Sequence, residues 1–126
     1  MNNETINADL VTLGRFKSRV LSASTLSGDD VYNQNGNKLG SIKEIMIDIQ
    51  DGSICYAVLS FGGLFSLGEK LFAIPWSAFT VDTENKRLLL DVEEEMLKKA
   101  PGFDADSWPN MADDSWRKSI HSYYTL

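Results

Sequence analysis

Residues 61–76 read Phe-Gly-Gly-Leu-Phe-Ser-Leu-Gly-Glu-Lys-Leu-Phe-Ala-Ile-Pro-Trp, and this stretch joins two strongly apolar runs, Ile54–Phe61 and Leu71–Ile74. Its glycines let the backbone reach positive φ and approach neighbouring chain closely. Pro75 ends the second run because proline lacks the N–H that a strand ladder requires. The stretch is therefore predicted to form two strands joined by a glycine-rich loop.

The loop itself carries three large apolar side chains, Leu64, Phe65 and Leu67. A loop of this length is too short to bury all three beneath itself. Two interpretations remain open. The loop either folds back over the mouth of a barrel, or it presents an association patch to another protein.

Turn signals divide the preceding residues into further strands. Asn35-Gly36 is a strong hairpin signal, and the next run, Leu39–Ile49, alternates apolar and polar residues except at Ile42. A bulge near Lys43-Glu44 would restore the alternation and bend the strand. Asp51-Gly52 marks a second hairpin turn, which leads into Ile54–Phe61.

The run Ile54–Phe61 is apolar on both faces, so another element must cover the outer face of the sheet. A further turn at Asp82–Lys86 leads to a last strand, Arg87–Val92. Five or six short strands joined by tight turns predict an all-β fold, a small antiparallel barrel.

The pattern becomes helical after Val92. Acids at the start and bases at the end of 93–99 favour a helix, which Pro101-Gly102 ends. Residues 103–111 look irregular. A last helix follows, capped by Asp113 or Asp114, with Trp116, Ile120 and Tyr123 or Tyr124 on one face.

The predicted division of the chain is a polar tail at 1–20, the barrel at 21–92 and a helical, aromatic extension at 93–126 packed on the barrel. In the tail, Leu10, Leu13 and Phe16 form either a short amphipathic helix or a loosely held segment.

Composition narrows the classes of partner. The net charge of −6 provides no basic surplus for nucleic acid. We expect a cytoplasmic protein, because no apolar run is long enough for a secretory signal or a membrane span. Cys55 is the only cysteine, so it forms no intrachain disulfide, and its apolar surroundings predict an inert buried thiol.

The motifs that suggest chemistry are incomplete. Gly63 and Gly68 have the spacing of a phosphate-binding loop, but Glu69 stands where a lysine would face phosphate. His121 is the only histidine and has no partner at a diagnostic spacing, so a structural or solvated role is expected. Pro109 stands where a calcium loop starting at Asp104 would need glycine. We therefore expect no catalytic residues, no cofactor and no metal.

More informative than these motifs is a set of five aromatic residues, Trp76, Trp108, Trp116, Tyr123 and Tyr124. They either pack internally between extension and barrel, or part of the set is buried in a second copy of the chain. The candidate interaction residues are accordingly Leu64, Phe65, Leu67, Trp76, Trp108, Trp116, Tyr123 and Tyr124.

Several of these stretches together carry a family resemblance over roughly residues 21–92. They are Val31-Tyr32-Asn33, Leu39-Gly40-Ser41-Ile42, Ile47-Asp48, Gly52 through Gly63, and Phe72-Ala73-Ile74-Pro75-Trp76. The combination resembles the PRC-barrel, a family named for the cytoplasmic domain of the photosynthetic reaction-centre H subunit. The extension, with Pro101-Gly102-Phe103 and Trp108-Pro109, is similar to stand-alone bacterial members.

The resemblance implies a protein-interaction module without catalysis. In the reaction centre such a domain packs on other subunits and supports proton delivery to a quinone, and in a ribosome-maturation factor it docks on a ribosomal protein. We expect a homodimeric interaction or assembly module with an unidentified protein partner. The alternatives are an accessory factor in membrane electron or proton transfer and a barrel that binds a small ligand.

Overall fold

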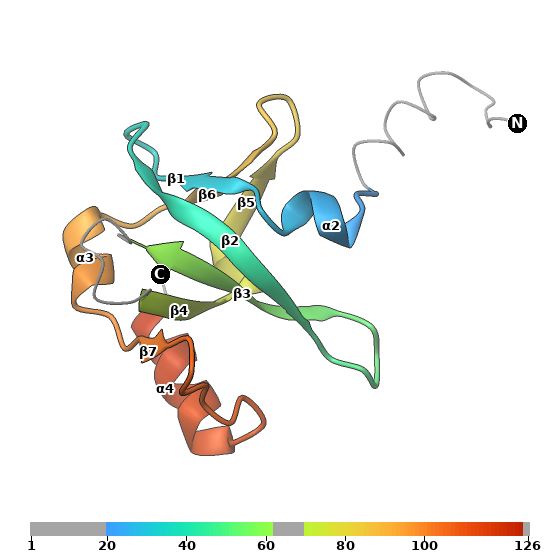
Figure 1. The fold of residues 1–126 in the computed structure, drawn as a ribbon, viewed down its shortest axis with the longest axis vertical. Coiled ribbons are helices and arrows are strands. Elements are labelled where there is room, and N and C mark those ends of the chain that lie inside the picture. The colour runs from blue at the N-terminus through green and yellow to red at the C-terminus, as the bar shows by residue number, and fades with distance from the viewer. Residues whose placement is uncertain (1–19, 62–69, 125–126) are drawn as a thin grey trace, which may run out of the picture.

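The computed structural model describes residues 20–61 and 70–124, and Figure 1 shows how their elements are arranged. The expectations for Leu10, Leu13 and Phe16 lie outside these residues. The elements in chain order are α2 (Ala23–Leu26), β1 (Asp30–Tyr32), β2 (Lys38–Ile47), β3 (Ile54–Phe61), β4 (Lys70–Pro75), the 3₁₀ turn η3 (Trp76–Ala78), β5 (Phe79–Asp82), β6 (Arg87–Leu90), α3 (Glu94–Lys98), β7 (Phe103–Asp104) and α4 (Asp114–Tyr124).

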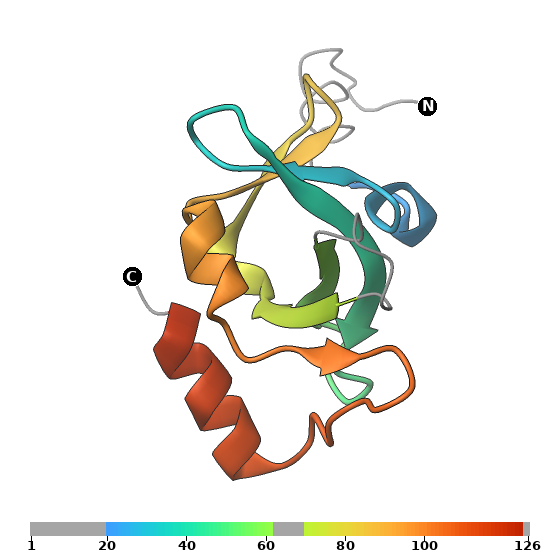
Figure 2. The same ribbon diagram turned by 60° about the vertical axis from the view of Figure 1, so that its left-hand side comes forward.

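The strands form one seven-stranded sheet in the order β5-β6-β1-β2-β3-β4-β7. In the described part of the chain its two end strands, β5 and β7, do not pair with each other, so the hydrogen-bonded sheet is open. An all-β fold with a C-terminal helix was predicted and is found. Figure 2 shows the long strand β2 curving along the sheet, with α3 and α4 together on one side.

Two details of the predicted sheet were wrong. The sheet is not purely antiparallel, because β1 and β6 pair in parallel through Val31–Leu88 and Tyr32–Leu89. These strands are far apart in sequence, so no tight turn fixes their relative direction. The count of five or six strands is also too low, because Phe103–Asp104 adds β7 to β4.

Gly102 explains how β7 reaches the sheet. A Cβ atom at this position would lie 2.8 Å from Cε1 of Phe72 and 2.9 Å from the carbonyl oxygen of Leu71. Only glycine lets the backbone pass this close to β4. The segment expected to be irregular therefore begins with two paired residues.

The predicted turns and the predicted bulge are confirmed. Gly36 and Gly52 have φ of 84° and 78°, as tight turns require. The pairing of β2 with β3 shifts register between Ile42 and Glu44, where the bulge was expected, and shifts again between Met46 and Ile47. Each shift adds twist and bends the strand.

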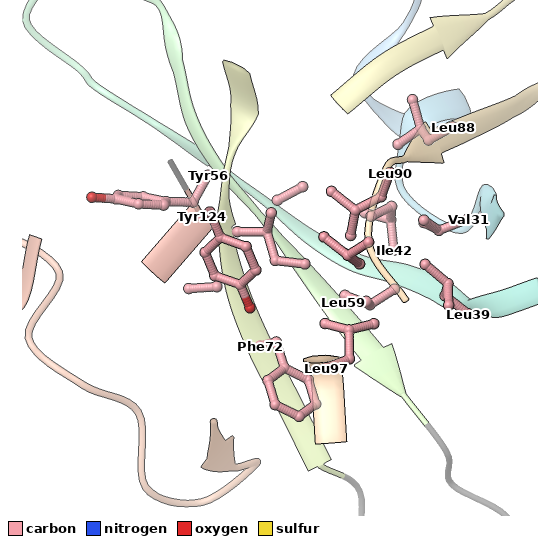
Figure 3. Packing of buried hydrophobic residues seen from close by; sticks show 14 of the residues in the cluster. Val31, Leu39, Ile42, Tyr56, Leu59, Phe72, Leu88, Leu90, Leu97 and Tyr124 are labelled. Carbon is pink, nitrogen blue, oxygen red and sulfur yellow. The ribbon is translucent and has the colours of Figure 1, made fainter. Parts of the chain in front are cut away.

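The core lies between the sheet and the two C-terminal helices. β3 is buried on both faces, with Tyr56 3% exposed and Ala57, Val58 and Leu59 0% exposed. α4 supplies the cover that the doubly apolar run required, and its Ile120 is 1% exposed. Figure 3 shows side chains from the sheet, α3 and α4 meeting in one cluster.

The helix ends follow the sequence signals. The carboxylate of Asp113 accepts the backbone N–H of Trp116 at 2.9 Å, so Asp113 caps α4. α3 begins with Glu94 and Glu95 and ends with Lys98, as its helix dipole favours. The short helix α2 was not predicted, although Ser22 caps it by accepting the N–H of Thr25 at 3.2 Å.

Candidate binding groove

The hairpin of β2 and β3 extends beyond the neighbouring strands, as Figure 1 shows. Two aspartates hold its turn: Asp48 Oδ1 accepts the N–H of Gln50 at 2.9 Å, and Asp51 Oδ1 accepts the N–H of Ser53 at 2.9 Å. Both carboxylates therefore satisfy backbone N–H groups of the turn. The bonds from Ser53 lower the pKa of Asp51.

Apolar side chains are left accessible at this end of the hairpin. Ile47 is 51% exposed and Ile49 is 95% exposed, and Met46 and Ile54 are partly exposed. Strand β2 has no neighbour on its β1 side here, because β1 reaches only the first residues of β2, Lys38–Ser41, in the described part of the chain. The hairpin end therefore offers an apolar surface on a rigid support.

α4 contacts the same strands through aromatic rings. The ring of Tyr56 meets Trp116 edge to face at 5.3 Å and His121 at 5.8 Å between ring centroids. The hydroxyl of Tyr56 lies 3.4 Å from Nε2 of His121. These contacts fix α4 beside β3 and bring its polar residues near the hairpin.

A groove of about 850 Å³ lies between the hairpin end, η3 and the start of α4. Its volume is within the range of about 300–1,000 Å³ that is common for ligand sites. The residues that line it come from four separate parts of the chain: Met46, Ile47, Asp48, Gln50, Ser53, Ile54, Cys55, Tyr56, Pro75, Trp76, Ser77, Met111, Ala112, Arg117 and His121.

The polar groups of the groove gather around Tyr56. Burial raises the pKa of its hydroxyl, and the neighbouring Arg117 partly opposes this rise. Arg117 is itself held by an ion pair with Asp114 at 3.2 Å, where both side chains are more than half exposed. Exposed pairs of this kind contribute little stability.

Cys55 departs from its expected environment. It was predicted to be buried and inert within a strand, but it is only partly buried and lines the groove. Cys55 is the second residue of β3, and the pairing of β3 with β4 begins only at Tyr56.

Of the five described interaction residues, Trp108 is exposed, Tyr124 is buried, and the other three are partly buried. Trp76 lines the groove and packs against Phe79 with 5.8 Å between ring centroids. Trp108 is 40% exposed and does not line the groove. The structure does not bring these two tryptophans into one surface.

The other described members of the set face inward. Trp116 packs on Tyr56, Tyr123 donates to the carbonyl oxygen of Met96 at 2.7 Å, and Tyr124 is 4% exposed. Trp116 therefore joins the extension to β3, whereas Tyr123 joins α4 to α3 within the extension. Leu64, Phe65 and Leu67 lie outside the described residues.

Sequence reasoning missed the groove because its walls are distant in the chain. Met46, Met111 and Arg117 carried no motif, and His121 was expected to be structural or solvated. The one available signal was the alternation of apolar residues in Leu39–Ile49. It continues through Ile47 and Ile49 up to the turn, which is farther than the core requires.

The described ranges, 20–61 and 70–124, hold neither a metal-binding cluster nor a helix that could span a membrane. Within these ranges no three histidine, cysteine, aspartate or glutamate side chains come together as a metal site. No helix there is both long and apolar enough to cross a lipid bilayer.

Comparison with known proteins gives a family match and a distant structural likeness. The model of the PRC-barrel domain matches residues 19–97. RimM from Pseudomonas aeruginosa, named as a 16S ribosomal RNA processing protein, is similar at 17% identity with a TM-score of 0.43. The likeness covers 63% of this chain and 49% of RimM, so the chain spans about half the length of that neighbour. No curated protein matches the chain.

Proposed function

This chain belongs to the PRC-barrel family, and from that membership we propose that it is a non-enzymatic protein–protein interaction module that works as a homodimer in the cytoplasm. The net charge of −6 favours a protein partner over nucleic acid. The family match ends at residue 97, so the contacts of the extension are a feature of this chain beyond the shared domain.

The observation that carries the proposal is the exposed indole of Trp108. Its ring packs against Phe103 with 5.1 Å between centroids, and its Nε1–H donates to the carbonyl oxygen of Ala105 at 2.8 Å. The ring is therefore held in place while 40% of the residue stays exposed. Pre-positioned tryptophans are frequent energetic centres of protein interfaces.

The surroundings of Trp108 extend this surface toward the predicted loop. Phe103 pairs with Leu71, and Asp104 pairs with Lys70, the residue that follows the apolar loop in the chain. We include Leu64, Phe65 and Leu67 in the proposed contact because they shortly precede Lys70 in the sequence, and Lys70 pairs with β7. The proposed interface thus centres on Trp108, Phe103 and this loop.

A small closed barrel is the finer form that we propose for the sheet. Two register shifts in β2 support it, because bulges bend a strand and increase its twist. The family to which the chain belongs is named for a barrel. A crystal structure with β5 and β7 far apart and both edges in solvent would contradict closure.

Light scattering across micromolar concentrations tests the dimer. We expect a dimer for the natural chain and a shift toward monomer for Trp108→Ala. Ile49→Ala is the matched control, because it removes an exposed apolar side chain from the hairpin end and should leave the mass unchanged. Circular dichroism checks that each variant is folded. A monomer at every concentration would rule out the homodimer.

Crosslinking in the native cells tests the partner. We expect the natural chain to be crosslinked to one specific protein. That crosslink should be lost with Trp108→Ala and retained with Ile49→Ala. Recovery of the same partner with both variants would place the interface elsewhere.

A further inference from the structure

The groove between the β2–β3 hairpin end and α4 has a mixed chemistry that the interaction module does not require. Apolar side chains of Met46, Ile54, Trp76 and Met111 supply part of its lining. The remainder includes hydrogen-bond donors, the most prominent being Arg117. We propose that this groove binds a small molecule that has an apolar body and a single carboxylate.

The apolar part of the lining suits a flat or flexible hydrocarbon body. Trp76 provides a ring face, which is held by its contact with Phe79 at 5.8 Å. Met46 and Met111 come from different segments and can adapt their unbranched side chains to a ligand's shape. A volume of about 850 Å³ accommodates a small molecule.

The α4 side of the groove supplies the partner for a carboxylate. A guanidinium has five N–H donors in a planar fork that matches the two oxygens of a carboxylate. Arg117 uses Nη1 for Asp114 at 3.2 Å, and that aspartate side chain is 83% exposed. The Arg117 side chain is 53% exposed, so a ligand carboxylate can reach the guanidinium and compete with Asp114 for it or share it.

Two other groups reinforce the polarity of this side. The hydroxyl of Tyr56 lies beside both Arg117 and Nε2 of His121, the latter at 3.4 Å. The side chains of Tyr56 and His121 both line the groove, and each can donate to an oxygen atom there. Tyr56 is 3% exposed, and its contacts with Trp116 and His121 hold its ring in place.

One acidic group lines the groove as well. Asp48 belongs to the hairpin wall, and its Oδ1 accepts the N–H of Gln50 at 2.9 Å. Its charge repels a ligand carboxylate at that wall. The ligand is therefore oriented with its carboxylate toward α4 and its apolar body toward Met46 and Trp76.

The site is independent of the proposed dimer, because Trp108 does not line the groove. It also differs from a cavity inside the sheet, since the core residues Val31, Leu59 and Ile74 are each 0% exposed. A failure of either proposal leaves the other standing.

Calorimetry with 4-phenylbutyrate as the probe tests the site, with 4-phenylbutyramide as its uncharged match. We expect saturable binding of the acid in the millimolar range or tighter, and binding of the amide weaker by about tenfold, the loss of one charged hydrogen bond. Arg117→Gln should weaken the acid by about tenfold and leave the amide unchanged. Amide NMR shifts should cluster on residues 46–56 and 111–121.

Lys118→Gln is the matched control, because it removes the same charge from the next residue of α4, which does not line the groove. It should change the affinity for the acid by less than about twofold. Three outcomes would each overturn the proposal: no saturable binding of the acid, equal affinity for acid and amide, or equal losses for the two variants.

Discussion

At the scale of single residues, Tyr123 and Tyr124 end α4 next to each other, yet their hydroxyls meet opposite environments. The Tyr123 hydroxyl donates to the carbonyl oxygen of Met96 at 2.7 Å and so ties α4 to α3. The Tyr124 hydroxyl is buried and has no hydrogen-bond partner among residues 20–61 and 70–124. Figure 3 shows its ring pointing into the apolar cluster.

Removing each hydroxyl should therefore have opposite effects on stability. Tyr123→Phe is expected to lower the free energy of unfolding by about 1 kcal/mol, because a hydrogen bond to the backbone is lost. Tyr124→Phe is expected to be neutral or stabilising by up to about 1 kcal/mol, because an unsatisfied buried group disappears. Urea denaturation of both variants checks this order, and a larger loss for Tyr124→Phe would contradict it.

A second residue-scale prediction concerns Gly40 on β2. A Cβ atom there would lie well inside contact distance of the Ser60 carbonyl oxygen on β3. Because backbone cannot move aside without breaking the ladder, Gly40→Ala should lower the free energy of unfolding by about 2 kcal/mol or more.

Gly36→Ala provides the matched control for this clash. A side chain at Gly36 is also unfavourable, but the reason is its φ of 84°. No atom of the described residues lies within 4 Å of the Cβ that alanine would add. Gly36→Ala should lower the free energy of unfolding by about 1 kcal/mol. Equal losses for the two variants, measured by urea denaturation, would show that close strand approach is unimportant at Gly40.

At the scale of elements, α4 depends on its cap more than on its surface ion pair. Asp113 accepts the N–H of Trp116 at 2.9 Å, whereas Asp114 forms an exposed ion pair with Arg117. Asp113→Ala is expected to lower the free energy of unfolding by about 1 kcal/mol. Asp114→Ala should change it by less than about 0.5 kcal/mol. Urea denaturation distinguishes the two, and the reverse order would refute the capping role.

At the scale of the whole molecule, burial of the C-terminal helix makes stability depend on pH at the alkaline end. Burial raises the pKa of Tyr124 above its ordinary value of 10.0. Above that pH the unfolded chain releases the phenol proton while the folded chain keeps it. Unfolding then releases a proton, so stability falls as the pH rises.

Tyr124→Phe should flatten this alkaline limb. Between about pH 9 and about pH 11 the natural chain is expected to lose stability more steeply than the variant, because the variant has no phenol to ionise at this position. Some slope remains, since burial also raises the pKa of Tyr56. Urea midpoints measured across this range check the prediction, and identical slopes would contradict it.

The acidic limb of the same stability curve involves Asp82. Its hydrogen bonds with Asn85 and then with Arg87 lower the pKa of its carboxyl. The stability that these bonds contribute is fully present above the pKa of Asp82 in the unfolded chain. It is lost as the pH falls through the lower pKa of the folded chain. Asp82→Asn should therefore make the loss of stability below about pH 4 less steep, which acid titration of the unfolding midpoint measures.

Local sequence patterns were enough to specify the features that adjacent residues encode. Asn-Gly and Asp-Gly placed the turns at Gly36 and Gly52, and the out-of-phase Ile42 placed the bulge in β2. The doubly apolar run of β3 required a cover, and the stripe containing Ile120 supplied it. Side-chain periodicity and turn chemistry are local, so they can be predicted from a single chain.

Which distant segments meet could be seen only in the folded chain. The parallel pairing of β1 with β6, the addition of β7 to β4, and the groove between Met46 and Arg117 all join residues without a common local pattern. The same aromatic stripe could have packed within the chain or against a second copy. The path of the chain buried Tyr124, packed the partly buried Trp116 on Tyr56 and left Trp108 exposed, because contacts between distant segments depend on the whole fold.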